Sequence, residues 1–222
     1  MSYRVKLLVF FVGAVAVLLV LNLGYSALQT ISRLNAVEAE RDHWQRPSDI
    51  LQALDLKPGN VVVDLGCGSG YFTLKLSSPV GDGGGVIAED IRRLPLMFLR
   101  ARAISRREHN VKIVVGDPTD PHLPTGVNAV LILNTYHEFT DSHPILAHVQ
   151  QSLVPGGRLV VVDRKPKPGG SYASETAEHE ISAERVESEL RQANFEVVSR
   201  QDRFIEHDSY GESWWLIIAR KP

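Results

Sequence analysis

Hydrophobic residues follow two patterns along the chain, and each pattern predicts a different kind of structure. Every position from residue 7 to residue 21 is apolar or glycine, as in a membrane helix or a signal segment. Further on, short runs of consecutive apolar residues alternate with segments that have helical periodicity. Such runs are typical of strands buried on both faces of a parallel α/β sheet. The predicted strands are residues 60–64, 86–90, 111–115 and 129–133, with a turn and a fifth strand over 153–163.

The segments between these strands predict helices. One helix follows Arg46-Pro47, with Ser48 as its N-cap and apolar residues at 50, 51 and 54. Another covers residues 70–77 and ends before a loop over 79–85, which is rich in glycine and proline. Further helices are predicted over residues 94–108, 141–153 and 182–193.

The chain ends in two further strands with no helix between them. Residues 195–204 and 214–219 have strand character and are joined by a polar connection of about ten residues. Two consecutive strands of this kind predict an antiparallel hairpin at the edge of the sheet. A polar loop over 164–178 precedes them, and we expect it to cover the substrate side.

The apolar segment near the amino terminus allows three interpretations. It has no charge between Lys6 and Arg33, and 15 to 17 helical residues span about 23–26 Å of a hydrocarbon core that is ~30 Å thick. We favour a single-pass membrane anchor. A cleaved signal peptide and a helix lying in the membrane interface remain open. Basic residues flank the segment on both sides, so charge does not settle its orientation.

Composition limits the rest of the chain to one globular domain. The 222 residues are 44% hydrophobic and carry a net charge of −2, which gives no indication of nucleic-acid binding. The single cysteine, Cys67, excludes an internal disulfide framework and a cysteine zinc cluster, and the sequence predicts no metal site. We expect an anchor over residues 1–30, a connector over 31–46 and a catalytic domain over 47–222.

A glycine-rich turn after the first predicted strand indicates a nucleoside site. Asp64-Leu65-Gly66-Cys67-Gly68-Ser69-Gly70 has glycines at alternate positions and leads into a helix. The dinucleotide fingerprint requires a glycine where Tyr71 stands, so a pyrophosphate is disfavoured. The Asp64 carboxylate repels phosphate and suits an ammonium group. Together these features favour a cationic nucleoside ligand.

This motif resembles that of the class I S-adenosylmethionine-dependent methyltransferases. The resemblance extends over residues 47–221 and includes the later Leu-Val-Pro-Gly-Gly sequence at 153–157. It implies an α/β fold with a Rossmann-like seven-stranded sheet, a C-terminal antiparallel hairpin and S-adenosylmethionine as the cofactor. An NAD-dependent oxidoreductase and an inactive methyltransferase-like binding module remain as alternatives.

The resemblance also implies roles for individual residues. Asp64 lies near the amino-acid moiety of the cofactor, Asp90 accepts hydrogen bonds from its ribose, and Asp117 reaches its adenine. His137 is the candidate general base, because its ordinary pKa is close to neutrality. A structural hydrogen-bonded pair of His137 with Glu138 is the alternative. The predicted catalytic residues are Tyr136 and His137. We expect both to face the transferable methyl group, together with Asn134 and Glu138. The predicted cofactor-binding residues are Asp64, Gly66, Gly68, Gly70, Asp90, Asp117 and Asn134.

The expected partners are a small-molecule or lipid-like acceptor and a membrane. Six arginines between residues 92 and 107 predict a basic surface, which either contacts anionic lipid or is simply solvated. We expect a single-pass membrane protein with a cytoplasmic catalytic domain, because the implied cofactor is made in the cytosol. The sequence leaves the acceptor atom and the oligomeric state open.

Overall fold

The computed structural model describes residues 2–167, 179–207 and 211–222 and divides the chain into two compact units. From residue 3 onward the first unit, Met1–His43, is formed by helix α1 (Tyr3–Trp44), which has no buried residue. Its apolar part is long enough to cross a membrane, by length and composition alone. The connector was predicted over residues 31–46, and residues 31–44 of it are part of this continuous helix.

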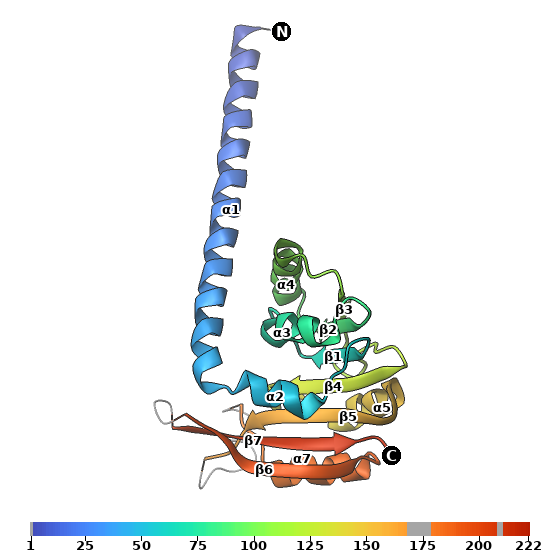
Figure 1. The fold of residues 1–222 in the computed structure, drawn as a ribbon. Helices are drawn as coiled ribbons and strands as arrows, with labels where there is room; N and C mark the ends of the chain where they lie inside the picture. The colour runs from blue at the N-terminus through green and yellow to red at the C-terminus, as the bar shows by residue number, and fades with distance from the viewer. Residues whose placement is uncertain (1, 168–178, 208–210) are drawn as a thin grey trace. The chain divides into compact units, whose positions relative to one another are not determined.

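The second unit, Trp44–Pro222, is built around a seven-stranded sheet. The strand order is β3-β2-β1-β4-β5-β7-β6, in which β1 to β5 are parallel and β7 runs antiparallel to both of its neighbours (Figure 1). This arrangement confirms the predicted Rossmann-like sheet with its terminal hairpin. The strands are β1 (Val61–Leu65), β2 (Gly85–Asp90), β3 (Val111–Val115), β4 (Val127–Leu133), β5 (Leu153–Arg164), β6 (Glu196–His207) and β7 (Glu212–Arg220).

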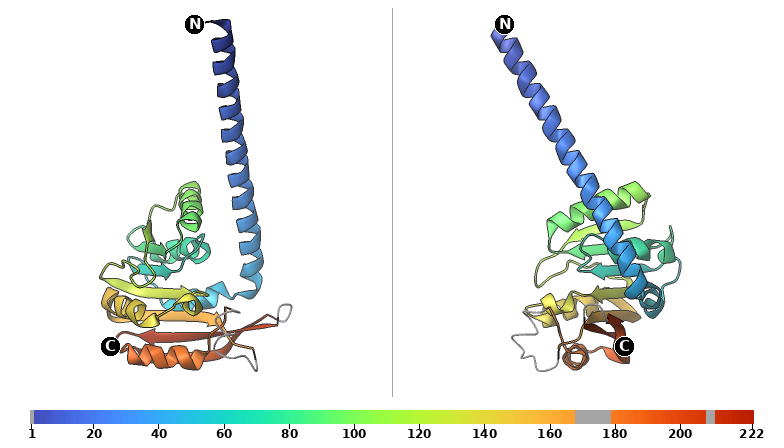
Figure 2. Two further views of the ribbon diagram at one scale, coloured as in Figure 1. Left: turned by 180° about the vertical axis from the view of Figure 1, so that it is seen from behind. Right: turned by 90° about the vertical axis from the view of Figure 1, so that its left-hand side faces the viewer.

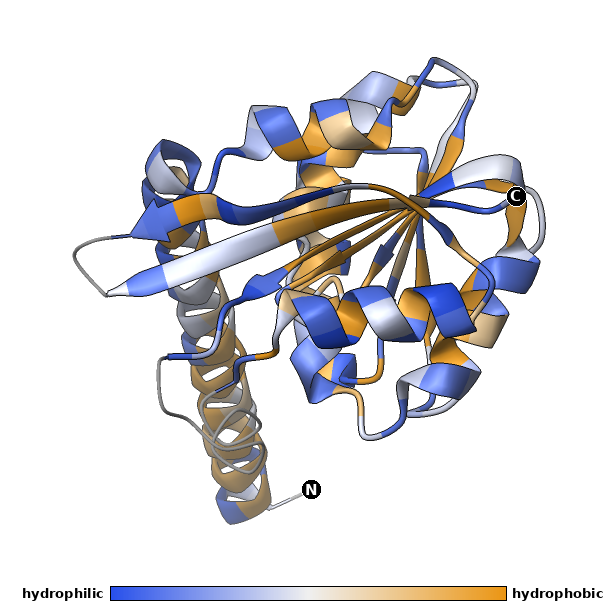
Figure 3. Cartoon of the chain, turned by 90° about the horizontal axis from the view of Figure 1, so that it is seen from below, coloured by the Kyte–Doolittle hydropathy of each residue, from blue (hydrophilic) through white to orange (hydrophobic). Residues whose placement is uncertain are grey.

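Helices cover both faces of the sheet (Figure 2). Apolar residues of α2 and α3 pack on one face, where α4 adjoins α3, while α5 and α7 pack on the other. The central strands are hydrophobic along most of their length, as Figure 3 shows, which explains their continuous apolar runs in the sequence. The helices are α2 (Pro47–Leu54), α3 (Tyr71–Val80), α4 (Arg93–Arg106), α5 (Ser142–Ser152) and α7 (Ala183–Gln192), with a short 3₁₀ turn η1 (Tyr136–Glu138).

Two predicted helix boundaries are wrong. Arg46, not Ser48, occupies the N-cap position of α2, because Pro47 is well suited to the first helical position. Helix α3 continues through Pro79 to Val80, although we predicted a loop from residue 79. A proline in the last turn removes one hydrogen bond, and Val80 gains complete burial in the core.

One arginine of the predicted basic surface is buried, and most of the predicted covering loop is not described. Arg102 is buried, with 2% of its surface exposed, and donates from Nη1 to the Ser69 carbonyl at 2.5 Å. It therefore supports the glycine turn and is not part of the predicted basic surface. Residues 168–178, most of the loop that we expected to cover the substrate side, lie outside the described residues.

Candidate functional site

The glycine turn after β1 lies against the segment that follows β4. Gly66 and Gly68 have φ angles of 73° and 56°, which favour glycine. A Cβ atom at Gly66 would lie 2.2 Å from Cγ2 of Thr135, so only glycine allows this close approach. A Cβ atom at Gly68 would meet nothing within 4 Å. The turn thus packs tightly on one side and faces open space on the other, as a ligand-binding backbone requires.

A cavity of about 220 Å³ lies at the carboxyl ends of β1, β2 and β4. Its walls combine acidic side chains with apolar ones. Four carboxylates and one guanidinium line it, so the charge balance favours a cationic ligand and disfavours a diphosphate. The acidic lining residues are Glu89, Asp90, Asp117 and Glu138, the basic one is Arg92, and the apolar ones include Leu65, Ile91, Phe139 and Ile145.

Asp90 is the most firmly held of these carboxylates. It is 2% exposed, and its Oδ2 accepts from the Gly68 amide at 2.9 Å. Its Oδ1 accepts from the Arg92 amide at 2.8 Å. The Arg92 guanidinium also contacts this carboxylate, at 3.1 and 3.3 Å, but its side chain is 56% exposed. A ribose diol bound at Asp90 would replace this exposed guanidinium and leave the two backbone hydrogen bonds intact.

Glu89 adds a carboxylate that titrates near neutrality. Burial, helped by the neighbouring Asp90 and Asp64, raises its pKa from 4.5 to about 7, although a hydrogen bond from the Gly66 amide acts in the opposite direction. Below pH 7 Glu89 is mostly protonated and neutral, so the cavity carries one negative charge fewer. Above pH 7 its negative charge strengthens the attraction for a cation.

Of three other predicted cofactor residues, one lines the cavity and two do not. Asp117 lines the cavity and lies 2.9 Å from Nε2 of His122. Asp64 is 4% exposed, accepts from the Thr73 hydroxyl at 2.6 Å, and is not among the lining residues. Asn134 accepts from Nε of Arg164 at 3.1 Å, also outside the cavity lining. Gly66, Asp90 and Asp117 are therefore the predicted residues that the fold brings together at the cavity.

Tyr136 is directed away from the cavity, which corrects the expectation that it faces the methyl group. Its hydroxyl donates to Oε2 of Glu189 on α7 at 2.7 Å, and the residue is 1% exposed in the core. Burial raises the pKa of this phenol. Residues 136 and 137 follow one another in the η1 turn, where successive side chains point in different directions. We therefore do not retain Tyr136 as a catalytic candidate.

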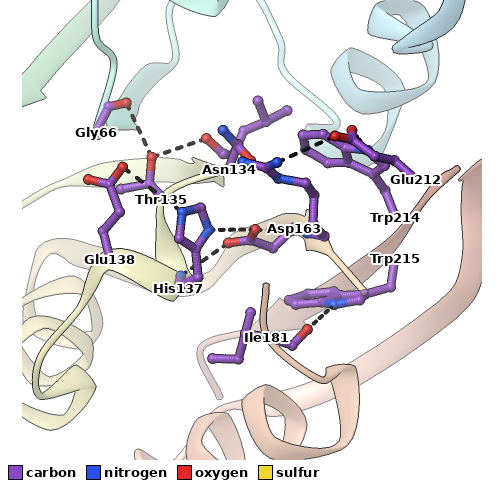
Figure 4. Close-up of polar contacts among 12 residues, drawn as sticks. Gly66, Asn134, Thr135, His137, Glu138, Asp163, Ile181, Glu212, Trp214 and Trp215 are labelled. Atoms are coloured by element: carbon purple, nitrogen blue, oxygen red, sulfur yellow. Dashed lines mark hydrogen bonds and ion pairs between the residues drawn. The ribbon is translucent and has the colours of Figure 1, made fainter. Parts of the chain in front are cut away.

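His137 pairs with an acid that sequence reasoning missed. Its Nδ1 lies 2.8 Å from Oδ1 of Asp163, and the two side chains are 2% and 0% exposed (Figure 4). Asp163 also accepts from the His137 amide at 3.2 Å. The alternative from the sequence was a hydrogen-bonded pair with Glu138, but Oε1 of Glu138 lies 4.0 Å from Nε2 of His137. Asp163 ends the fifth apolar run, and an acid at a strand end was the signal that would have identified it.

This pairing decides which nitrogen of His137 is available. A carboxylate beside Nδ1 favours the proton on that atom, which leaves the lone pair on Nε2. Nε2 is directed toward Glu138, whose side chain lines the cavity. His137 therefore offers one acceptor nitrogen to the cavity side.

Comparison with known proteins adds family information to this geometry. A family model described as a methyltransferase domain matches residues 62–157. Nocamycin O-methyltransferase from Saccharothrix syringae is 30% identical over 120 residues, which cover 54% of this chain and 43% of that protein. Demethylmenaquinone methyltransferase from Shouchella clausii is 26% identical over 131 residues, which cover 59% and 56%. The chain thus spans about half the length of these relatives.

Solved structures show the same fold. An S-adenosylmethionine-dependent methyltransferase from Aquifex aeolicus superposes with a TM-score of 0.70 at 21% identity, over 86% of this chain and 98% of that one. A geranyl diphosphate methyltransferase in complex with S-adenosylmethionine superposes with a TM-score of 0.67 at 19% identity, over 80% and 85%. At these identities the likeness concerns the fold.

Proposed function

Because the domain that spans residues 62–157 belongs to the class I S-adenosylmethionine-dependent methyltransferase family, we propose that this protein methylates a small-molecule or lipid-like acceptor. The observation that carries the proposal is the acidic cavity beside Gly66 and Asp90 at the strand ends. Ligands of open α/β sheets bind at this edge. S-adenosylmethionine supplies an activated methyl group on a sulfonium, whose positive charge suits the carboxylates of the cavity.

Each chain residue in this proposal has a positional role. Asp90 accepts the ribose hydroxyls, and Asp117 reaches the adenine at the outer wall. Asp64, which accepts from the Thr73 hydroxyl on α3, lies near the amino-acid moiety. Nε2 of His137 accepts a proton from the acceptor, while Asp163 holds the ring in the matching tautomer. Alignment of acceptor and methyl group is the main requirement of the reaction.

A lipid-like acceptor fits three observations. Ile91, Phe139 and Ile145 provide apolar surface next to the carboxylates of the cavity. A relative at 26% identity is named for demethylmenaquinone, a quinone. Helix α1 supports a membrane anchor, which would place the domain beside a hydrophobic acceptor. We propose residues 1–30 as this anchor and a cytoplasmic orientation for residues 47–222.

Replacing Asp90 by alanine should weaken S-adenosylmethionine binding about 5–150-fold. Two ribose hydroxyls would lose their acceptor, which costs about 1–3 kcal/mol. Isothermal titration of the full-length protein in detergent measures the affinity. Asp82→Ala is the matched control, because Asp82 is an exposed acid in the loop before β2 and should leave the affinity unchanged. Equal affinities of wild type and Asp90→Ala would refute the ribose assignment.

A further inference from the structure

Three side chains with metal-binding atoms meet beside the cavity. His137, Glu138 and His179 each offer one ligand atom, and these atoms all lie within 4.8 Å of one another. The first two belong to the η1 turn, and His179 immediately precedes the segment that leads into α7. His137 is buried, whereas Glu138 and His179 are exposed. The cluster therefore has one fixed member and two members that can adjust.

The fixed member is already oriented as a metal ligand. Asp163 binds Nδ1 of His137 at 2.8 Å and leaves the Nε2 lone pair directed toward Glu138 (Figure 4). A carboxylate behind a histidine is the usual way to set the tautomer of a metal-bound imidazole. Two ligand atoms of a tetrahedral zinc ion lie about 3.3–3.4 Å apart, since each bond is about 2.0–2.1 Å long. Nε2 of His137 and Oε1 of Glu138 are 4.0 Å apart, and the Glu138 side chain is 43% exposed, so a small movement of Glu138 closes the gap.

The second histidine is held near the first by the chain that follows it. The amide of Ile181 donates to the Arg164 carbonyl at 3.0 Å, and Nε1 of Trp215 donates to the Ile181 carbonyl at 2.7 Å. The first bond attaches the segment after His179 to the end of β5, next to Asp163, and the second attaches it to β7, where Trp215 pairs with Asp163. The rings of His137 and His179 lie with centroids 5.2 Å apart at 81°. His179 is exposed, so its side chain is able to rotate toward a shared ion.

We propose that His137, Glu138 and His179 bind a divalent transition-metal ion of the zinc type at the wall of the cavity. Two imidazoles and one carboxylate suit such an ion and leave positions open for a further ligand. Glu138 lines the cavity, so an open position faces it. If the proposed methyl transfer holds, an oxygen of the acceptor would complete the coordination there. The bound ion would act as a Lewis acid toward that oxygen, whose proton would pass to water, and Nε2 of His137 would then be a ligand in place of a proton acceptor.

Zinc binding by the full-length protein in detergent tests the site without any methyl acceptor. Equilibrium dialysis with elemental analysis should find one zinc per chain, and Co²⁺ should give a visible spectrum that zinc abolishes. His179→Ala and Glu138→Gln should weaken binding at least about tenfold, and Asp163→Asn about 10–100-fold. His143→Ala is the matched control, because His143 forms an exposed pair with Asp141 elsewhere and should bind zinc like wild type. Excess Mg²⁺ should not compete, since it prefers oxygen ligands.

The proposal is wrong if His179→Ala and Glu138→Gln both bind zinc as tightly as the wild type does. It is also wrong if the wild type binds no zinc. Both replaced side chains are exposed, so folding does not confound these two variants. Titration of the same preparations with S-adenosylmethionine separates this site from the proposed function. Cofactor binding without zinc binding refutes the metal site alone, whereas zinc binding without cofactor binding refutes the methyltransferase proposal.

Discussion

His137→Ala should lower methyl transfer about 10²–10⁴-fold and leave the affinity for S-adenosylmethionine unchanged. The loss follows because the variant has no Nε2 to accept a proton from the acceptor. The cofactor affinity stays, because His137 is not among the residues that line the cavity. Transfer of radiolabelled methyl groups to a lipid extract from the native cells measures turnover, and isothermal titration measures the affinity.

Two further variants make this result specific to the His137 pair. Asp163→Asn keeps the size of the side chain but favours the opposite tautomer of the imidazole, so it should also reduce turnover. His143→Ala changes an exposed histidine that likewise contacts an aspartate, and it should retain full turnover. If His137→Ala loses less than tenfold, His137 only shapes the pocket and the proposed catalytic role is wrong.

The second large effect concerns the location of the protein. Full-length protein should remain in the membrane pellet after a carbonate or high-salt wash, because the apolar part of α1 is long enough to span a bilayer. A shortened chain that begins near Arg41 should be soluble and should still bind cofactor. Immunoblots of the two fractions, with titration of the soluble form, measure both results.

Sequencing of the amino terminus distinguishes an anchor from a signal peptide. A native chain that begins near Ala27 and stays in the soluble fraction would show that the segment had been cleaved, which would contradict both the anchor and the cytoplasmic placement. A chain that keeps its first residues but leaves the membrane in high salt would indicate an interfacial helix.

The sequence predicted the architecture because the patterns that indicate strands, helices and turns depend on residues that are close together in the sequence. Strand β3 is found at residues 111–115 as predicted, and the acid at position 90 ends β2 beside the glycine turn. Parallel strands bring their carboxyl ends to one edge of the sheet, so the location of the site followed from the strand order of this fold class. The hairpin followed from two consecutive strands with no helix between them.

Side-chain directions and long-range pairs were not predictable in this way. Asp163 and His137 lie 26 residues apart, and only the pairing of β4 with β5 brings them together. Tyr136 turns into the core because Glu189 on α7 accepts from its hydroxyl. Arg102 lies in an arginine-rich helix yet reaches the Ser69 carbonyl. Each of these contacts depends on tertiary packing that periodicity and spacing do not encode.

The titration of the full-length protein with S-adenosylmethionine and, separately, with NAD tests the central claim most directly. The acidic cavity and the bulky Tyr71 after the glycine turn predict saturable binding of S-adenosylmethionine and no measurable binding of NAD. Methyl transfer from the bound cofactor to a lipid extract should then follow. Binding of NAD without binding of S-adenosylmethionine would contradict the account, and binding of S-adenosylmethionine without transfer to any acceptor fraction would indicate an inactive binding module.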